Sequence, residues 1–546
     1  MTIKKHVLPY FLILIPIVGL FYFIQQMGLN IPFWDDHALK ATVLDFENAT
    51  SWSDKILVLF KQHNEHRISL TRLLAVASFK LLGTINFQYL QYFGNFLWLG
   101  VGLIFYKVGT KSTLNIWHFV PISFLFFGLQ FHENTFWGMS AVQNFGIIFW
   151  ILWSIYLVSF HLDKLFWLAI ATSSFAVFTS GNGIFVIPII TMLLLLKKEF
   201  KKMFVYLCFG IGIIGIYFYQ FEFPPTKQTN FEIPIIALIK FTFAFIGQWA
   251  DIFSEMDINN RFQISMYFGI LLGIATMFIC ILSLKKIFFN THNKAKNIDF
   301  FTLGTIAFVF LTALVVVYKR IDYGQATILT SRYKMYSLVL MTIIYVYLLH
   351  YIPRLKTNFL AFLLSCASIM IAIIIVLESL PQIQWHKNLL LTSQANDWAN
   401  NTYPPAKLEV YQKPFNVFYK PDVKYGLNKQ ELFIKNVNDN QISVESKDFV
   451  TDNSWKNNCF LQLKSTKNTY YFPVYRNRNK SKKSFLTTFS YYEKGIKCLL
   501  SKDEISTGIY QVNLGFTQNN TLNIIPTNIG ELEIIQTAAQ KIDKNW

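Results

Sequence analysis

The residues best equipped for chemistry lie in one polar stretch near the start of the chain, residues 33–72. It opens with two adjacent acids, Asp35 and Asp36, and later carries a second polar cluster: His63, Glu65, His66 and Arg67. A carboxylate can accept a proton from an attacking hydroxyl, an imidazole can carry a proton, and a guanidinium can bind an anion. The stretch therefore has the ingredients of acid–base group transfer, and the competing interpretation is an ordinary solvated loop.

Neighbouring side chains on a short loop point in different directions, so only one of the two acids can easily occupy a catalytic position. Asp36 directly precedes residues 38–46, which we expect to form a short helix. We predict that Asp35 or Asp36 is the catalytic base and favour Asp36, because the residue nearer a helix is better fixed. Its alternative role is to cap that helix, since Asp is favoured at helix N-termini.

A second group of residues has the composition of a sugar-binding site: His132, Glu133, Asn134 and Trp137. A tryptophan face can stack on a sugar ring while polar side chains bond its hydroxyls. We predict sugar or acceptor binding for this group and for His63, Glu65 and His66. The alternative for the second group is an aromatic belt at the membrane surface.

A third group of residues is basic and surrounds one short loop: Lys319, Arg320, Arg332 and Lys334. Such a loop suits a phosphate, and the hydroxyl of Tyr333 adds a donor. We predict that the phosphate of a donor substrate is bound by five residues, with Arg332 the strongest candidate: Arg332, Arg67, Lys319, Arg320 and Tyr333. The alternative is that these side chains reach towards lipid head groups.

Metal and nucleic-acid binding find little support in the motifs. The spacing in HNEHR matches no standard zinc site and HEXXH is absent, so we predict no metal ligands. A divalent ion that bridges an acid and a substrate phosphate is the remaining alternative. The formal net charge is +18, but no basic stripe with interleaved stacking aromatics accompanies it, and we expect no nucleic-acid partner.

Composition identifies a polytopic α-helical membrane protein, because 53% of the 546 residues are hydrophobic and only 15% are charged. Apolar runs predict about eleven spans, near residues 7–24, 87–106, 116–130, 145–160, 165–179, 184–196, 203–219, 264–284, 300–318, 335–349 and 359–377. The first is expected to be a signal anchor, because it follows a basic start and lacks a small-residue cleavage site. The apolar segment 233–250 is expected to form an interfacial or re-entrant helix.

Clusters of lysine between the spans orient the chain, since positive charge favours the cytoplasmic side. This places the N-terminus in the cytoplasm and each polar motif above on the outer face of a bacterial inner membrane. We expect residues 1–380 to form the transmembrane module, with amphipathic helices in its first outer loop, residues 28–86. Residues 381–546, with short alternating runs, are expected to form a mostly β domain in the periplasm.

The chain resembles the GT-C membrane glycosyltransferases, which include the protein O-mannosyltransferases and the lipid A aminoarabinose transferase. The resemblance rests on a first span followed by Phe33, Trp34, Asp35 and Asp36, on HNEHR and the later SRY, and on many spans before an outer C-terminal domain. It covers residues 1–380. It implies a sugar donor on a polyprenyl phosphate, transfer with inversion, and a first-loop aspartate that acts as base on the acceptor.

The resemblance assigns the base to Asp35 or Asp36 and the donor phosphate to Arg332 and Arg67. The acceptor would be a hydroxyl on a glycan, a lipid or a protein such as pilin, and membrane lipid surrounds the site. An alternative enzyme is an O-antigen polymerase or ligase, but such proteins concentrate functional Arg and His in late loops. A lipid or sugar transporter should show polar residues at mid-span or repeated halves, which this sequence nearly lacks.

Overall fold

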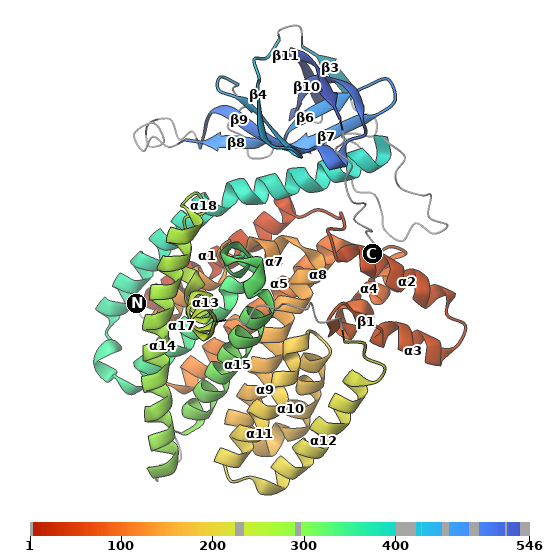
Figure 1. Cartoon of the computed structure of the whole chain (residues 1–546). Coiled ribbons are helices and arrows are strands. Elements are labelled where there is room, and N and C mark those ends of the chain that lie inside the picture. Colours follow the sequence, from red (N-terminus) through yellow and green to blue (C-terminus); the bar gives the residue numbers. More distant parts are fainter. Residues whose placement is uncertain are drawn as a thin grey trace. The chain divides into compact units, whose positions relative to one another are not determined.

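The computed structural model describes residues 4–223, 234–289, 296–399, 422–426, 429–449, 458–479, 487, 491–518 and 521–535 (Figure 1). The chain divides into two compact units. Unit 1 comprises Met1–Gln25, Ala41–Gly83 and Tyr89–Ser379. Unit 2 comprises Gln26–Lys40, Thr84–Gln88 and Leu380–Trp546. Four helices contribute residues to both units: α1, α2, α5 and α18.

Unit 1 is helical. Its principal helices are α1 (Lys4–Met27), α2 (Asp36–Asn48), α3 (Trp52–Phe60), α4 (Ser69–Leu82), α5 (Phe87–Lys111), α6 (Phe119–Phe126), α7 (His132–Phe136), α9 (Gly146–Phe160), α10 (Leu162–Val177), α11 (Val186–Leu196), α12 (Phe200–Phe218), α13 (Ile235–Gly247), α14 (Ile258–Phe289), α15 (Lys296–Arg320), α17 (Lys334–Tyr351) and α18 (Asn358–Ala399). Short helical turns join them at η1 (Ile116–His118), α8 (Gly138–Ser140), η2 (Ala141–Phe145), η3 (Gly181–Phe185), η4 (Gln248–Ala250), η5 (Ile321–Tyr323), α16 (Gln325–Ile328), η6 (Ser331–Tyr333) and η7 (Pro353–Leu355).

The structure confirms a helical membrane protein but does not support about eleven spans. Among the described residues, seven helical segments are long and apolar enough to cross a membrane: Val7–Met27, Gly138–Phe160, Phe200–Phe218, Ile258–Phe289, Asn297–Tyr323, Ser331–Tyr351 and Asn358–Asn396. The apolar runs expected at 116–130 and 184–196 form shorter helices, Ile116–Phe126 and Gly181–Leu196. A span needs about 20 residues at 1.5 Å rise each, so apolarity alone overstated the count.

The other two expected spans fall short for different reasons. Helix α10 has only 16 residues. Helix α5 has 25 residues but carries buried polar side chains at Gln91 and Asn95, which lower its hydropathy. Their amide groups donate hydrogen bonds to the carbonyls of Phe136 and Thr135, at 2.8 Å and 3.2 Å. These polar side chains therefore hold α5 to the segment that carries HENTFW.

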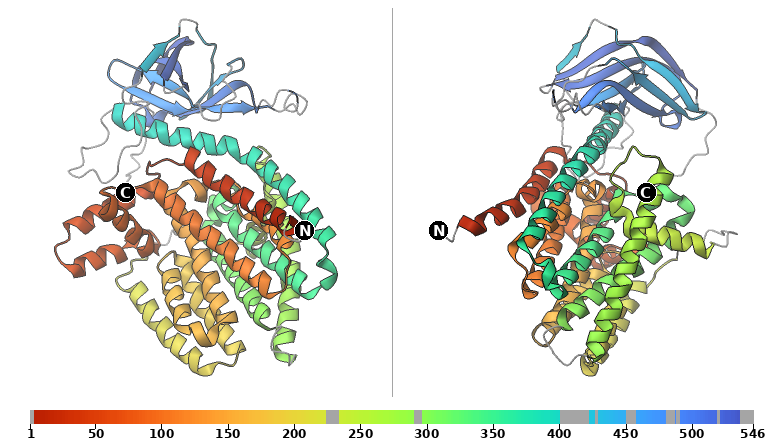
Figure 2. Two further views of the ribbon diagram at one scale, coloured as in Figure 1. Left: turned by 180° about the vertical axis from the view of Figure 1, so that it is seen from behind. Right: turned by 90° about the vertical axis from the view of Figure 1, so that its left-hand side faces the viewer.

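Close helix packing gives unit 1 a dense interior. Helix α9 packs against α10, α11 and α15, which lie beside one another in Figures 1 and 2. Helices α13 and α14 approach at Gly247 and Gly269, where an added Cβ would lie 2.0 Å and 1.8 Å from backbone oxygens of the facing helix. Only glycine permits such backbone contact. The segment 234–250 is thus a 13-residue helix, α13, followed by a turn, and it is shorter than a span.

Local sequence signals shape the first loop. The hydroxyl of Ser51 accepts a hydrogen bond from the backbone N–H of Asp54 at 3.1 Å and caps α3. Gly83, with φ of 74°, ends α4 in the left-handed conformation that glycine adopts at low cost. Between these helices a hairpin of β1 (Gln62–His63) and β2 (His66–Arg67) turns at Asn64, whose φ is 48°.

The described part of unit 2 confirms the expected β-rich C-terminal domain. One sheet has the order β3 (Asp422–Tyr425), β11 (Thr521–Ile534), β10 (Gly508–Gln518), β6 (Cys459–Lys464), β7 (Thr469–Pro473). The other has the order β4 (Phe433–Asn438), β5 (Gln441–Ser446), β9 (Tyr492–Ser501), β8 (Tyr475–Arg478). Alternating apolar residues of both sheets, such as Leu461 and Leu500, share one core. Figure 2 shows these sheets from two sides.

Candidate functional site

Two polar motifs that are far apart in the sequence meet in unit 1. The Nε atom of Arg332 lies 3.5 Å from Oε2 of Glu133, and the guanidinium lies 5.5 Å from the ring centre of Trp137. The backbone N–H of Arg332 donates to the same Glu133 oxygen at 3.3 Å, and Asn134 donates to the Arg332 carbonyl at 2.8 Å. We call Glu133, Asn134, Trp137, Ser331 and Arg332 the arginine cluster. It offers a cation, an aromatic face and hydrogen-bonding groups in one place.

An irregular helix supports the arginine cluster. The Asn134 side-chain oxygen accepts hydrogen bonds from Ser140 and Asn144, each at 2.8 Å. Ser140 ends α8, and Asn144 lies in η2, a π-helical turn that leads into α9. Such turns widen a helix locally and occur often at functional sites. The π turn brings Asn144 onto Asn134 and so fixes the segment that carries Glu133.

A buried charge network lies next to the arginine cluster, and the sequence motifs did not reveal it. Asp251 accepts two hydrogen bonds from Arg261, at 2.7 Å and 2.9 Å, and Nζ of Lys334 lies 3.1 Å from Oδ2 of Asp251. The Asp251 side chain is fully buried. Burial raises the pKa of Asp251, but the hydrogen bonds from Arg261 and the charge of Lys334 outweigh it and hold the pKa below its ordinary value.

His132 lies beside this network. Burial and, to a smaller extent, the nearby charge of Lys334 together lower the pKa of His132 to about 3. A backbone hydrogen bond to Leu129 opposes this fall in the pKa only in part. A neutral imidazole of such low basicity does not supply a proton at neutral pH. The structure therefore places His132 inside the protein next to Lys334.

A second meeting of distant motifs occurs at the hairpin. Oε2 of Glu65 lies 2.6 Å from Nζ of Lys319, and both side chains are partly exposed. Burial raises the pKa of Glu65, but the hydrogen bond from Lys319 and the charges of Lys319, His66 and Arg320 hold it below its ordinary value. Burial lowers the pKa of His66 despite the opposing charge of Glu65. We call Glu65, His66, Lys319 and Arg320 the lysine–glutamate cluster.

The TSGNG turn, residues 179–183, connects the two regions. A Cβ added to Gly181 would lie 2.5 Å from Nδ1 of His66, so the backbone of this turn packs directly against the imidazole. The next residue, Asn182, donates to the hydroxyl of Tyr336 at 3.0 Å and to Thr312 at 3.3 Å. Tyr336 follows SRYK by two positions, on α17. The turn therefore links the hairpin to the helix that begins at the arginine cluster.

The guanidinium of Arg67 is engaged in structural hydrogen bonds. Its guanidinium donates hydrogen bonds to the carbonyls of Phe60, Tyr217 and Tyr219, with the Tyr217 contact at 2.5 Å. Arg72 similarly donates to the carbonyls of Lys61 and Gln62. A guanidinium has five N–H groups. In Arg67 two of them hold the hairpin to the end of α12, and a third bonds the last residue of α3. Phosphate binding by Arg67 would have to use the remaining ones.

The FWDD loop belongs to unit 2. The backbone N–H of Phe33 donates to Oδ2 of Asp36 at 3.1 Å, and the N–H of Asp36 donates to the Phe33 carbonyl at 2.9 Å. Asp36 is 1% exposed and begins α2. These two hydrogen bonds close a turn over residues 33–36 that leads into α2. The Asp36 carboxylate here bonds a backbone N–H that precedes the helix, whereas the capping role expected for Asp36 would place it on an N–H inside the helix. Trp34, with φ of 44°, adopts a left-handed conformation that is costly for a bulky residue and that leaves its side chain exposed.

The C-terminal domain anchors the FWDD loop within unit 2. Leu29 and Ile31 pack with Leu390 and Leu391 of α18 and with Phe460 of β6. The ring of Phe33 meets His386 edge-on, with centroids 4.7 Å apart. Helix α18 is itself bonded to the domain, because Asn396 of α18 and Tyr471 of β7 exchange two hydrogen bonds, at 2.6 Å and 2.9 Å. The domain therefore positions the two adjacent acids.

The structure groups most of the predicted site residues. In unit 1 it joins Arg332 to Glu133, Asn134 and Trp137, with Tyr333 beside Arg332, and it joins Glu65 and His66 to Lys319 and Arg320. His63 pairs with His66 across the hairpin. Asp35 and Asp36 lie in unit 2. Among the described residues, no three His, Cys, Asp or Glu side chains gather in a way that could hold a metal ion.

Comparison with protein-family models, with curated proteins and with solved structures finds no match for this chain.

Proposed function

We propose that the protein is an inverting glycosyltransferase that moves a sugar from a polyprenyl-phosphate donor to an acceptor hydroxyl. The observation that carries this proposal is the arginine cluster, where a guanidinium lies over Trp137 and beside Glu133 and Asn134. A guanidinium recognises a phosphate, and an aromatic face next to polar groups recognises a sugar ring. A phosphate-linked sugar combines both features in one molecule.

The chemistry needs few groups. The acceptor oxygen attacks the anomeric carbon, the bond from that carbon to the phosphate oxygen breaks, and the hydroxyl proton passes to an aspartate. The polyprenyl phosphate leaves with an added negative charge that Arg332 stabilises. Attack opposite to the leaving group inverts the anomeric configuration. No nucleotide-binding fold is required for this reaction.

We propose that either Asp35 or Asp36 is the base, and the surroundings of the two side chains differ. Asp36 is buried and bonded to the Phe33 backbone, so it fixes the loop and the start of α2. Asp35 is only half-buried, which leaves it more accessible to an acceptor. The strained, exposed Trp34 beside it is consistent with a functional loop, because such conformations concentrate at active sites.

The proposed location is a bacterial inner membrane, with the N-terminus in the cytoplasm and the polar motifs and C-terminal domain in the periplasm. Lysine clusters between the apolar segments support this orientation. Reporter fusions after Lys202 and Lys286 should report cytoplasm, and fusions after Asn259 and Asp397 should report periplasm. A cytoplasmic signal at Asp397 would contradict a single outer site.

The proposed base is tested by Asp35→Asn and Asp36→Asn, made separately in membranes that contain polyprenyl-phosphate sugar. Asn keeps the size of Asp but removes its basicity, so a true base should lose a factor of about 10² to 10⁴ in rate. Protein level and donor binding should stay near normal in that variant. If both single variants keep near-normal turnover, neither acid is the base and the proposed role of this loop fails.

A further inference from the structure

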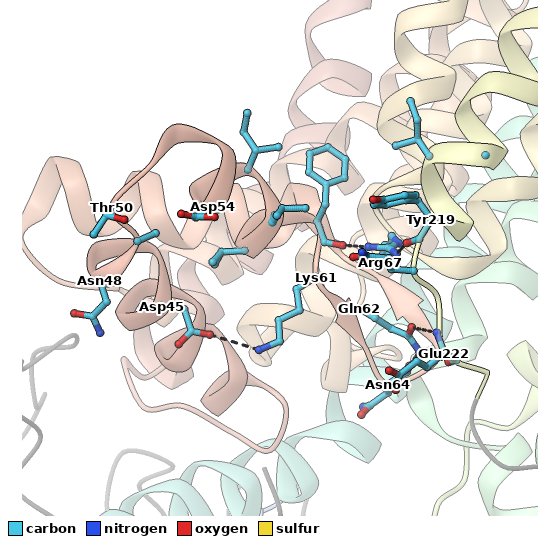
Figure 3. Close-up of a pocket in the computed structure, with 18 of the residues that line it drawn as sticks. Asp45, Asn48, Thr50, Asp54, Lys61, Gln62, Asn64, Arg67, Tyr219 and Glu222 are labelled. Carbon is cyan, nitrogen blue, oxygen red and sulfur yellow. Dashed lines mark hydrogen bonds and ion pairs between the residues drawn. The ribbon is translucent and has the colours of Figure 1, made fainter.

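A large open cavity lies in unit 1 between the first-loop helices and the end of α12, with a volume of about 1330 Å³. Figure 3 shows Asp45 and Asp54 on one side, Tyr219 and Glu222 on the other, and Lys61 between them. The residues of the arginine cluster do not line it. The cavity is therefore available for a ligand other than the one placed at Arg332.

One wall of the cavity is apolar and includes part of a candidate membrane span. Ile56 and Leu57 come from α3, a helix without a buried residue, and Ile216 comes from α12, a candidate membrane span that is mostly unburied. Between them, Gly212 and Gly215 leave space, because an added Cβ would meet nothing within 4 Å at either position. Such a wall suits hydrocarbon chains, since a spanning helix with an exposed apolar face contacts lipid.

The opposite side of the cavity is polar and suits a head group that ends in an amine or a hydroxyl better than one that ends in a phosphate. Lys61 lies 3.6 Å from Asp45, and Arg67 donates to backbone carbonyls. Among the described residues, no basic side chain forms an ion pair with Asp54 or Glu222, although both line the cavity. Carboxylates in this state favour hydrogen-bond donors and positive charge, and they repel anions. A hydroxyl-bearing or amine-bearing head group fits this side.

The hairpin is the wall that the cavity shares with the lysine–glutamate cluster. Gln62 pairs with Arg67, and His63 pairs with His66, and side chains alternate between the two faces of a strand. Gln62 and Arg67 line the cavity, whereas His66 packs against Gly181. Gln62 also exchanges two hydrogen bonds with the backbone of Glu222, at 2.7 Å and 2.9 Å, which fixes the hairpin against the end of α12. A ligand in the cavity would thus be separated from Glu65 and Lys319 by one residue pair of the hairpin.

We propose that this cavity binds the acceptor and that the acceptor is a membrane lipid with a hydroxyl-bearing or amine-bearing head group. The lipid chains occupy the wall of Ile56, Leu57 and Ile216, and the head group reaches Asp54 and Glu222. The role of this lipid as acceptor rests on the proposed transferase function. Binding of the lipid to the cavity does not depend on that function, and the two claims can be tested separately.

The test fills the cavity without disturbing its walls. Gly212→Phe and Gly215→Phe add a ring into open space within a helix, and Gly19→Phe on α1 is the matched control, because Gly19 also has nothing within 4 Å and does not line the cavity. The full-length protein is placed in phosphatidylcholine nanodiscs that contain phosphatidylethanolamine with a photoreactive acyl chain. Labelled peptides are then identified by mass spectrometry, with photoreactive phosphatidic acid as the anionic comparison.

The wild-type protein and Gly19→Phe should be labelled by the phosphatidylethanolamine probe within residues 54–60 or 211–219. Gly215→Phe and Gly212→Phe should lower this labelling about tenfold, because an overfilled site binds more weakly by roughly 1.4 kcal/mol or more. Equal labelling in all four proteins would overturn the proposal, and so would stronger labelling by phosphatidic acid. Labelling confined to other segments would overturn it as well.

The outcome separates this inference from the proposed function. If the probe labels the cavity and no sugar is transferred to any lipid, the lipid site stands and its role as acceptor site fails. If sugar is transferred but only to protein or polysaccharide, and the filled variants transfer normally, the lipid inference fails while the transferase proposal stands.

Discussion

Arg332 and Glu133 are 199 positions apart in the sequence and meet twice in the structure, once through the guanidinium and once through the Arg332 backbone N–H. The side-chain contact of 3.5 Å is loose, and Nε of Arg332 has no close hydrogen-bond partner among the described residues. Glu133 thus orients the arginine without saturating it. The guanidinium retains donors that a phosphate oxygen could accept.

The first prediction concerns this arginine. Arg332→Lys keeps the charge but loses the planar fork that can bind a phosphate through two hydrogen bonds. We expect the apparent KM for the polyprenyl-phosphate donor to rise about 10- to 100-fold, as expected for loss of hydrogen bonds to a charged group. The measurement is donor-dependent transfer in proteoliposomes. Arg354→Lys, at an exposed arginine in η7, is the control, and equal KM values in both variants would contradict the phosphate role.

The second prediction concerns the shared carboxylate of Asp251. Asp251→Asn leaves the buried Lys334 and the partly buried Arg261 without this carboxylate. Breaking a buried pair in this way costs about 3 to 5 kcal/mol. Thermal unfolding in detergent should show a large fall in the midpoint temperature. Asp163→Asn is the control, because Asp163 pairs with Lys202 on the surface with 85% of its side chain exposed and exposed pairs contribute little. Similar midpoints for both variants would argue against a stabilising network.

The third prediction is a pH dependence that arises from His132. Its folded pKa of about 3 lies below the ordinary 6.5, so the unfolded chain binds the proton more readily. Stability is therefore full above pH 6.5 and is lost as the pH falls towards 3, by about 3 kcal/mol between pH 7 and pH 4. Unfolding of the wild-type protein and His132→Asn should be compared across this range. If the variant loses stability as steeply as the wild type, His132 is not the source.

The fourth prediction concerns the two cysteines of the C-terminal domain. Cys459 on β6 and Cys498 on β9 are free and lie in one buried core. Burial raises the pKa of Cys459 to about 12 and also raises that of Cys498, which keeps both as unreactive thiols. A thiol reagent should label neither in the folded protein and both after unfolding without reductant. Labelling that appears only after reduction would show instead that the two are joined by a disulfide.

The sequence predicted the class of fold well and its details unevenly. Apolar composition and alternating runs were sufficient for a helical membrane protein with a β-rich tail. The described residues do not support the expected number of spans, because runs such as residues 184–196 are apolar through burial among other helices. Hydropathy does not distinguish a helix surrounded by protein from one surrounded by lipid.

The candidate site was predictable in its parts but not in its connections. Residue types singled out Arg332 and Trp137, yet no spacing rule joins positions 195 apart. The network of Asp251, Arg261 and Lys334 was not predicted, because the sequence grouped Lys334 with the basic loop and only tertiary packing brings it to Asp251 and Arg261. Arg67 shows the reverse, since its motif suggested a ligand and its guanidinium binds backbone carbonyls.

The most direct measurement of the proposed function follows a labelled sugar. Membranes that lack the protein are first supplied with radioactive sugar nucleotides, so that labelled polyprenyl-phosphate sugars accumulate. The purified full-length protein is then added. We expect label to leave the polyprenyl-phosphate fraction and to appear in an acceptor with inverted anomeric configuration, and we expect this movement to be much slower with Arg332→Lys. If label stays in the polyprenyl-phosphate fraction for every sugar supplied, the protein is not a transferase that uses these donors.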